Sequence, residues 1–105
     1  MAKRTIIEWG SGADIHGEDP LKAVSRAVSD AIHHSCLNAY ACGHIDEPLT
    51  LRVNIACPDA YRLRESDVRE LFPVGDIQSV AIKDGGLLCP NGTLIALAAI
   101  EIDLE

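Results

Sequence analysis

Residues 93–102 read TLIALAAIEI, a stretch that is apolar at nearly every position up to Ile100. Alternate side chains of a β-strand point to opposite faces of a sheet, so both faces of this segment are apolar. That composition is typical of strands that are buried on both sides. The segment therefore predicts a strand with helices on one face and a second covering surface on the other.

Three upstream segments have the β-branched or alternating composition of strands. They are residues 5–9, 51–57 and 77–83. The first is expected to stop at Gly10-Ser11-Gly12, the second at Pro58, and the third at Asp84-Gly85-Gly86. Each of these endings contains glycine or proline, which interrupt regular pairing of strands.

A long helix is expected after the first strand. Asp19 and Pro20 supply an N-cap and a first-turn proline, and apolar residues then recur every three or four positions to about Leu37. The alanines of this helix share one side and indicate close approach to a sheet; they are Ala23, Ala27 and Ala31.

A second, short helix is expected before the third strand. Ser66 is its predicted cap, Glu65 and Arg69 are spaced as an ion pair, and Pro73 ends it.

The order strand, helix, strand, helix, strand, strand predicts an α/β protein of the two-layer α+β type, with a mixed four-stranded sheet. Right-handed crossovers make the first three strands mutually parallel, and the short link before the last makes it antiparallel to the third. If the chain progresses in one direction across the sheet, both helices lie on one face. The other face is then bare, and we expect it to be buried in a homo-oligomer.

Length and composition limit the class of protein. The 105 residues allow a single domain, 1–105, and are too few for a doubly wound dinucleotide-binding fold or an α/β-barrel. A net charge of −7 argues against nucleic acid or an anionic membrane as partner. No apolar run approaches the roughly 20 residues that cross a bilayer, and none that suits a secretory leader follows residues 1–4. We therefore expect a cytoplasmic protein with reduced cysteines.

The carboxyl ends of parallel strands share one edge of a sheet, where such folds usually hold ligands. Asp14 and His16 in the first loop are the candidate acid/base pair or ligands to a divalent metal, and Lys83 is a candidate base, nucleophile or anion clamp. The candidate ligand-binding residues at this edge are Gly10, Ser11, Gly12, Gly17, Asp59, Gly85 and Gly86.

Each of these residues also has a purely structural interpretation. Asp14 and His16 fit hydrogen bonds that hold their own loop together, and Lys83 fits an exposed lysine at the end of a strand. The Gly-x-Gly of residues 10–12 is not a dinucleotide fingerprint, because Ile15 replaces its last glycine.

A second cluster of potential ligands lies at the end of the long helix and in the loop after it. It consists of His33, His34, Cys36, Cys42 and His44. Its spacing matches no standard zinc site, so helix capping and packing are the favoured roles. Cys57 continues an apolar strand face and is predicted to be a core residue rather than a nucleophile.

The string GSGADIHG at residues 10–17 resembles the GxGxDxHG motif of a small family of uncharacterised bacterial and plant proteins. The later segment DVRELFPVGDIQSVAIKDGGL is also similar to that family. The resemblance implies that the motif residues matter to the family's function, and it brings no activity with it. The order of elements is similar to that of the trimeric Bacillus-type chorismate mutases and YjgF-like deaminases, which bind small molecules between subunits.

We therefore expect a small cytoplasmic homo-oligomer, a trimer, with an enzyme-like site for a small polar metabolite near a subunit interface. The alternative is a non-catalytic protein that binds a metal or a metabolite. The sequence leaves open whether the chain is an enzyme.

Overall fold

The computed structural model describes residues 4–16, 19–33, 49–72 and 75–104. Five strands form one mixed sheet. They are β1 (Arg4–Asp14), β2 (Leu49–Ala56), β3 (Asp76–Lys83), β4 (Leu87–Leu88) and β5 (Leu94–Leu104). The helices are α1 (Pro20–His33), α3 (Glu65–Arg69) and the short 3-10 turn η1 (Ala60–Arg62).

The last long strand lies in the middle of the sheet. The strand order is β1-β5-β2-β3, and β5 is antiparallel to both of its long neighbours. The first three long strands run in one direction and succeed one another across the sheet, as predicted, but β5 is inserted between β1 and β2. The apolar composition of β5 on both faces explains its place, because a central strand is shielded by neighbours as well as by layers.

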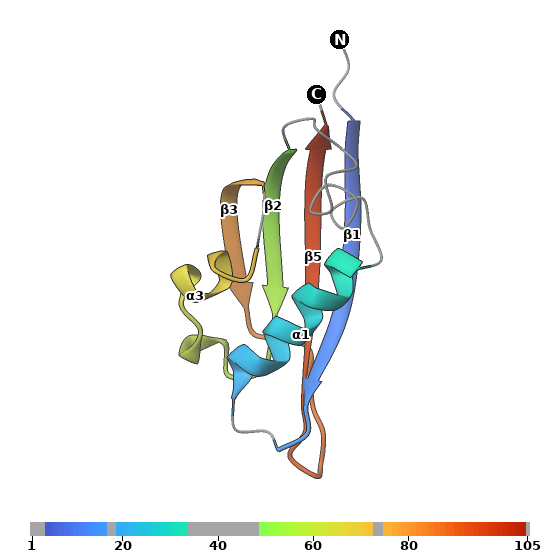
Figure 1. The fold of residues 1–105 in the computed structure, drawn as a ribbon. Helices are drawn as coiled ribbons and strands as arrows, with labels where there is room; N and C mark the ends of the chain where they lie inside the picture. Colours follow the sequence, from blue (N-terminus) through green and yellow to red (C-terminus); the bar gives the residue numbers. More distant parts are fainter. Residues whose placement is uncertain (1–3, 17–18, 34–48, 73–74, 105) are drawn as a thin grey trace.

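Both helices lie on one face of the sheet, as predicted (Figure 1). Val68 of α3 belongs to the same buried cluster as the apolar side of α1. In the described part of the chain the fold is thus a two-layer α+β arrangement whose second face carries no helix. No helix in the described part of the chain is long and apolar enough to span a membrane.

Several predicted boundaries were wrong. β1 does not stop at Gly10 but continues to Asp14, paired with β5 throughout. Arg64 rather than Ser66 occupies the N-cap position of the short helix, without a side-chain capping hydrogen bond. The predicted ion pair is present, with Arg69 Nη2 2.8 Å from Glu65 Oε1. The short strand β4 lies between the third and last predicted strands and was not predicted. The expected extension of α1 to Leu37 lies outside the described residues.

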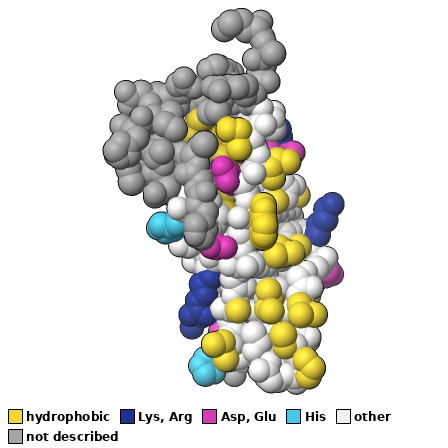
Figure 2. Space-filling model, turned by 90° about the vertical axis from the view of Figure 1, so that its right-hand side faces the viewer, with side chains coloured by type: hydrophobic (Ala, Val, Ile, Leu, Met, Phe, Trp, Pro, Cys, Tyr) yellow, Lys and Arg dark blue, Asp and Glu magenta, His cyan; other side chains and the backbone are white. Residues whose placement is uncertain are grey.

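The helix-free face, which we call the open face, carries large exposed hydrophobic side chains. Ile7 and Trp9 of β1 are 60% and 69% exposed, and Leu97 of β5 is 44% exposed. Figure 2, which looks onto the β1 side of the molecule, shows hydrophobic side chains along this side and at its lower end. Large exposed apolar patches on a protein surface are typical of sites that bind another molecule.

At one end of the open face, charged side chains pair with one another. The guanidinium of Arg52 binds Asp103 and lies 3.3 Å from Glu101 Oε2. Its hydrogen bond with Asp103 raises the pKa of Arg52, so the side chain stays charged. Thr5 Oγ1 also donates to Asp103 Oδ1 at 2.9 Å. The charged groups at this end of the face are therefore paired within the chain, although Ile7, opposite Glu101, is 60% exposed.

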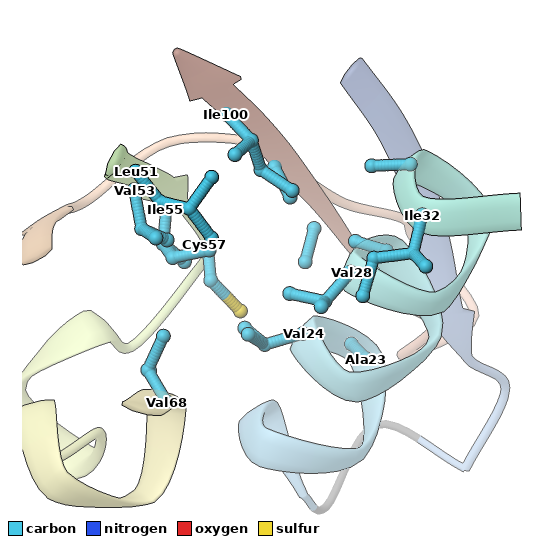
Figure 3. Close-up of a cluster of buried hydrophobic side chains, with 14 of the residues drawn as sticks. Ala23, Val24, Val28, Ile32, Leu51, Val53, Ile55, Cys57, Val68 and Ile100 are labelled. Atoms are coloured by element: carbon cyan, nitrogen blue, oxygen red, sulfur yellow. The ribbon is translucent and has the colours of Figure 1, made fainter. Parts of the chain in front are cut away.

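The core lies between the sheet and α1 (Figure 3). α1 buries a stripe of small residues, Ala23, Ala27 and Ala31, each with no exposed surface. Two glycines of β1 lie directly beneath them. A Cβ on Gly10 would lie 2.4 Å from the Ala31 backbone nitrogen, and one on Gly12 would lie 2.3 Å from that of Ala27. The predicted close approach of helix and sheet is confirmed, and it requires glycine on the strand.

We expect Gly12→Ala to lower the free energy of unfolding by about 2–3 kcal/mol or more, because the new methyl group overlaps helix backbone that cannot rotate away. Urea unfolding followed by circular dichroism measures this. Ser11→Ala in the same strand is the matched control, with an exposed side chain and an expected change within about 0.5 kcal/mol. Equal stabilities of the two variants would contradict the packing argument.

Candidate functional site

The carboxyl ends of β1, β2 and β3 lie at one edge of the sheet, because these strands run in the same direction. The loops after β2 and β3 are joined there, since the Ala60 N–H donates to Asp84 Oδ1 at 3.2 Å. The loop after β1 meets the start of β5, where Thr93 Oγ1 donates to the Ile15 carbonyl at 3.4 Å. The structure thus gathers the predicted loops along one edge.

Asp14 is the last residue of β1 and is only 3% exposed. Its Oδ2 accepts the N–H of Asp19 at 3.1 Å. Asp19 in turn caps α1, because its Oδ1 accepts the N–H of Leu21 at 3.0 Å and that of Lys22 at 3.3 Å. Asp14 therefore holds the turn that leads from the strand into the helix.

His16 follows two residues later and is exposed. No hydrogen bond or ion pair joins its ring to another residue in the described part of the chain. Gly17 lies outside the described residues. Among the residues that are described, no group of three His, Cys, Asp or Glu side chains is placed to hold a metal ion.

The predicted glycine-rich loop is part of a strand. Gly10 and Gly12 pair with Ala98 and Ala96 of β5. The N–H of Ser11 points the other way and donates to Asp30 Oδ2 at 3.0 Å. Backbone groups alternate in direction along an antiparallel strand, so the N–H groups of both glycines point toward β5. These backbone donors belong to the fold.

Lys83 is the last residue of β3, which lies at the opposite lateral edge of the sheet from β1 and Asp14. Its side chain borders a hollow of about 260 Å³ on the open face. The lining residues are Asn54, Ile55, Ala56, Ala81, Lys83, Leu97 and Ala99. The structure therefore does not bring Lys83 to Asp14 within one chain.

The hollow and Asn54 were missed in the sequence. The signal was present, because the alternation of residues 51–57 places Asn54 on the same face as Arg52. What the sequence did not reveal is that Ala99 and Ala81 flank Asn54 on the neighbouring strands. The small side chains of Ala56, Ala81 and Ala99, on three adjacent strands, leave room for the depression.

Cys57 is a core residue, as predicted. It has no exposed surface, and its Sγ donates weakly to the Pro20 carbonyl at 3.9 Å. Burial, and secondarily the negative charge of Asp59, raise the pKa of the Cys57 thiol to about 11. A thiol in this environment is not a nucleophile at neutral pH.

Two further edge residues have special backbones. Asp59 adopts a left-handed conformation with φ 56°, the one positive φ among the described residues other than glycine. Gly86, with φ 69°, packs against the Ile95 carbonyl so closely that a Cβ would lie 2.1 Å from its oxygen. Gly85 is exposed, and its N–H donates to the Cys57 carbonyl at 3.4 Å.

The second predicted cluster is only partly described. His33 Nδ1 donates to the Ser29 carbonyl at 2.6 Å, in the last turn of α1. This contact fits the capping role. His34, Cys36, Cys42 and His44 lie outside the described residues.

Residues 4–103 match the family described as conserved hypothetical protein (Lin0512_fam), and the chain belongs to this family. It is similar to an FtsZ-like protein of unknown function from Nostoc punctiforme PCC 73102, whose crystal structure was solved at 1.22 Å resolution. The sequences are 32% identical, the match covers 100% of this chain and 98% of the other, and the TM-score is 0.78. No curated protein matches the chain.

We expect Asp14→Ala to lower the free energy of unfolding by about 1–3 kcal/mol, because it leaves the Asp19 N–H without its acceptor at a buried turn. His16→Ala is the matched control and should change stability by less than about 0.5 kcal/mol, since His16 is exposed. Chemical denaturation measures both. A larger loss for His16→Ala would show that the ring has a structural role.

We expect iodoacetamide to leave Cys57 unmodified in the folded protein at pH 8, where a pKa of about 11 leaves about one thiol in a thousand ionised. Labelling should begin only as the pH approaches 11 or when urea unfolds the chain. Peptide mass mapping identifies the modified residue, and the less buried Cys89 serves as the internal control. Rapid labelling of Cys57 at pH 8 would contradict its assignment to the core.

Proposed function

We propose that this protein binds a small anionic metabolite at the carboxyl edge of its parallel strands, in a site that is completed between copies of the chain. The observation that carries this proposal is a contrast among the charged groups of the edge. Asp14, Asp19 and Asp84 each accept a backbone N–H and serve the fold. His16 and Lys83 are exposed and have no such partner in the described part of the chain.

Two basic side chains suit an anionic ligand. A lysine ammonium donates strong charge-assisted hydrogen bonds to carboxylate or phosphate oxygens. An imidazole beside it can donate or accept a proton, which is the usual role of histidine in acid/base catalysis. In this proposal His16 exchanges the proton, Lys83 holds the anion, and Asp14 positions the turn that carries His16.

The two groups come from opposite sides of the sheet, which is why the proposal needs more than one copy. β1 and β3 are the outer long strands and run in the same direction. Copies arranged head to tail around an axis along the strands place the β1 end of one chain beside the β3 end of the next. His16 of one copy then lies at the same end of the sheets as Lys83 of its neighbour, with Lys83 in the row of Ser11 and His16 beyond the end of β1. The similarity in element order to trimeric folds favours a ring of three.

The test is binding of simple anions. Titration of the ¹⁵N-labelled protein with inorganic phosphate, pyruvate and citrate should shift amide signals of the loops around His16 and Lys83. His16→Ala and Lys83→Met should each weaken the binding of the responding anion about 10- to 100-fold, as expected for a lost charged hydrogen bond. Lys22→Met, an exposed lysine on α1, is the matched control.

Mixing variants tests the shared site. A ring assembled from His16→Ala and Lys83→Met chains contains junctions at which both intact side chains meet. Co-refolded mixtures should therefore recover part of the binding that each variant lacks alone. Absence of binding by all three anions, or an equal loss in Lys22→Met, would overturn the proposal.

A further inference from the structure

We infer that the open face is covered by a second copy of this chain, with Trp9 of one copy seated in the hollow of the next. This inference deepens the proposed function, because it names the surface through which the copies meet. It begins from a feature of one face: a ridge and a hollow lie side by side on it, on opposite sides of β5.

The ridge and the hollow lie at the same level along the strands. Trp9 pairs with Ala99 of β5, Ala99 with Asn54 of β2, and Asn54 with Ala81 of β3. This row therefore carries one very large side chain at the β1 edge and two alanines on the floor of the hollow. Trp9 is 69% exposed in a single chain, so it does not fold over its own hollow.

The stacking distance between sheets fits this contact. Sheets that pack face to face lie about 10 Å apart, and large side chains of one sheet fill spaces above small residues of the other. A protruding indole and an alanine-floored hollow are complementary in that sense. Because both occur on every copy, each chain can offer its ridge to one neighbour and its hollow to another. Such head-to-tail contacts form a ring when the rotation between neighbours closes.

The charges on the open face favour a copy of the chain as the occupant. The chain carries a net charge of −7, so two copies repel each other over most of their surfaces. On the open face, however, Arg52 and Lys83 offset two of the carboxylates, Glu101 and Asp103, and leave Asp76 at the start of β3. Lys83 borders the hollow at the end nearer the carboxyl edge of the sheet, which leaves its ammonium available to the proposed anion.

The area of the face is sufficient. Four long strands at about 4.8 Å spacing and about eight residues at about 3.4 Å rise give roughly 19 Å by 27 Å, on the order of 500 Å² in projection. Protruding side chains such as Ile7 and Leu97 enlarge this figure. Specific interfaces bury at least about 600 Å² on each partner, so a ring that covers the whole face reaches that range.

The experiment uses the single tryptophan as its probe. Native mass spectrometry and sedimentation of the full chain should give a multiple of its mass. Dilution should release monomers as Trp9 fluorescence shifts to the red and becomes open to acrylamide quenching. Trp9→Ser, which removes the ridge, and Ala81→Arg, which fills the hollow, should each raise the dissociation constant about 30-fold or more. Circular dichroism confirms that both variants fold.

Tyr61→Ser is the matched control, because Tyr61 is 84% exposed but lies in η1 rather than in the sheet. A protein that is monomeric at every concentration would overturn the inference, as would a complex whose mass includes a different protein. An oligomer that resists both Trp9→Ser and Ala81→Arg would also overturn it. That last result would leave the proposed ligand site standing, whereas a Trp9-dependent oligomer that binds no anion would remove only the ligand site.

Discussion

The close contact between α1 and β1 is the constraint on which the rest of the fold depends. Gly10 and Gly12 leave no side chain between the strand and the helix, and the alanine stripe of α1 rests almost on backbone. Contact at this range brings many atoms of helix and strand into van der Waals distance and excludes water between them. It also fixes the helix on one side of the sheet.

The position of the helix explains why the open face is bare. α1 covers β1 and β5, and α3 covers β3, all from the same side. The apolar residues of β5 that point away from the helices therefore receive no cover from α1 or α3. At one end of that face Arg52 pairs with Asp103 and Glu101, while Ile7, Trp9 and Leu97 keep apolar surface exposed to water.

The sequence predicted the element types from local periodicity, and the shared face of α1 and α3 from the right-handed crossovers between parallel strands. It did not predict that β5 enters between β1 and β2. Strand order depends on which strand buries the most apolar surface in the centre of the sheet. That requires comparing the burial of all the strands with one another, which local periodicity does not show. The end of β1 was misplaced for a related reason. Glycine weakens an isolated strand, yet here Gly10 and Gly12 are required by a helix that follows them in the chain.

The same reasoning changes the meaning of the GSGADIHG string. Gly10 and Gly12, the first two of its three glycines, make room for α1, and Asp14 holds the turn into that helix. These residues are thus explained by the fold, although their composition suggested a loop that binds a ligand. His16 is different, because its ring is exposed and no described contact uses it. In this motif Gly10, Gly12 and Asp14 serve the fold, and the exposed His16 follows them directly. The packing and the turn that these three residues support place the histidine at the edge of the sheet.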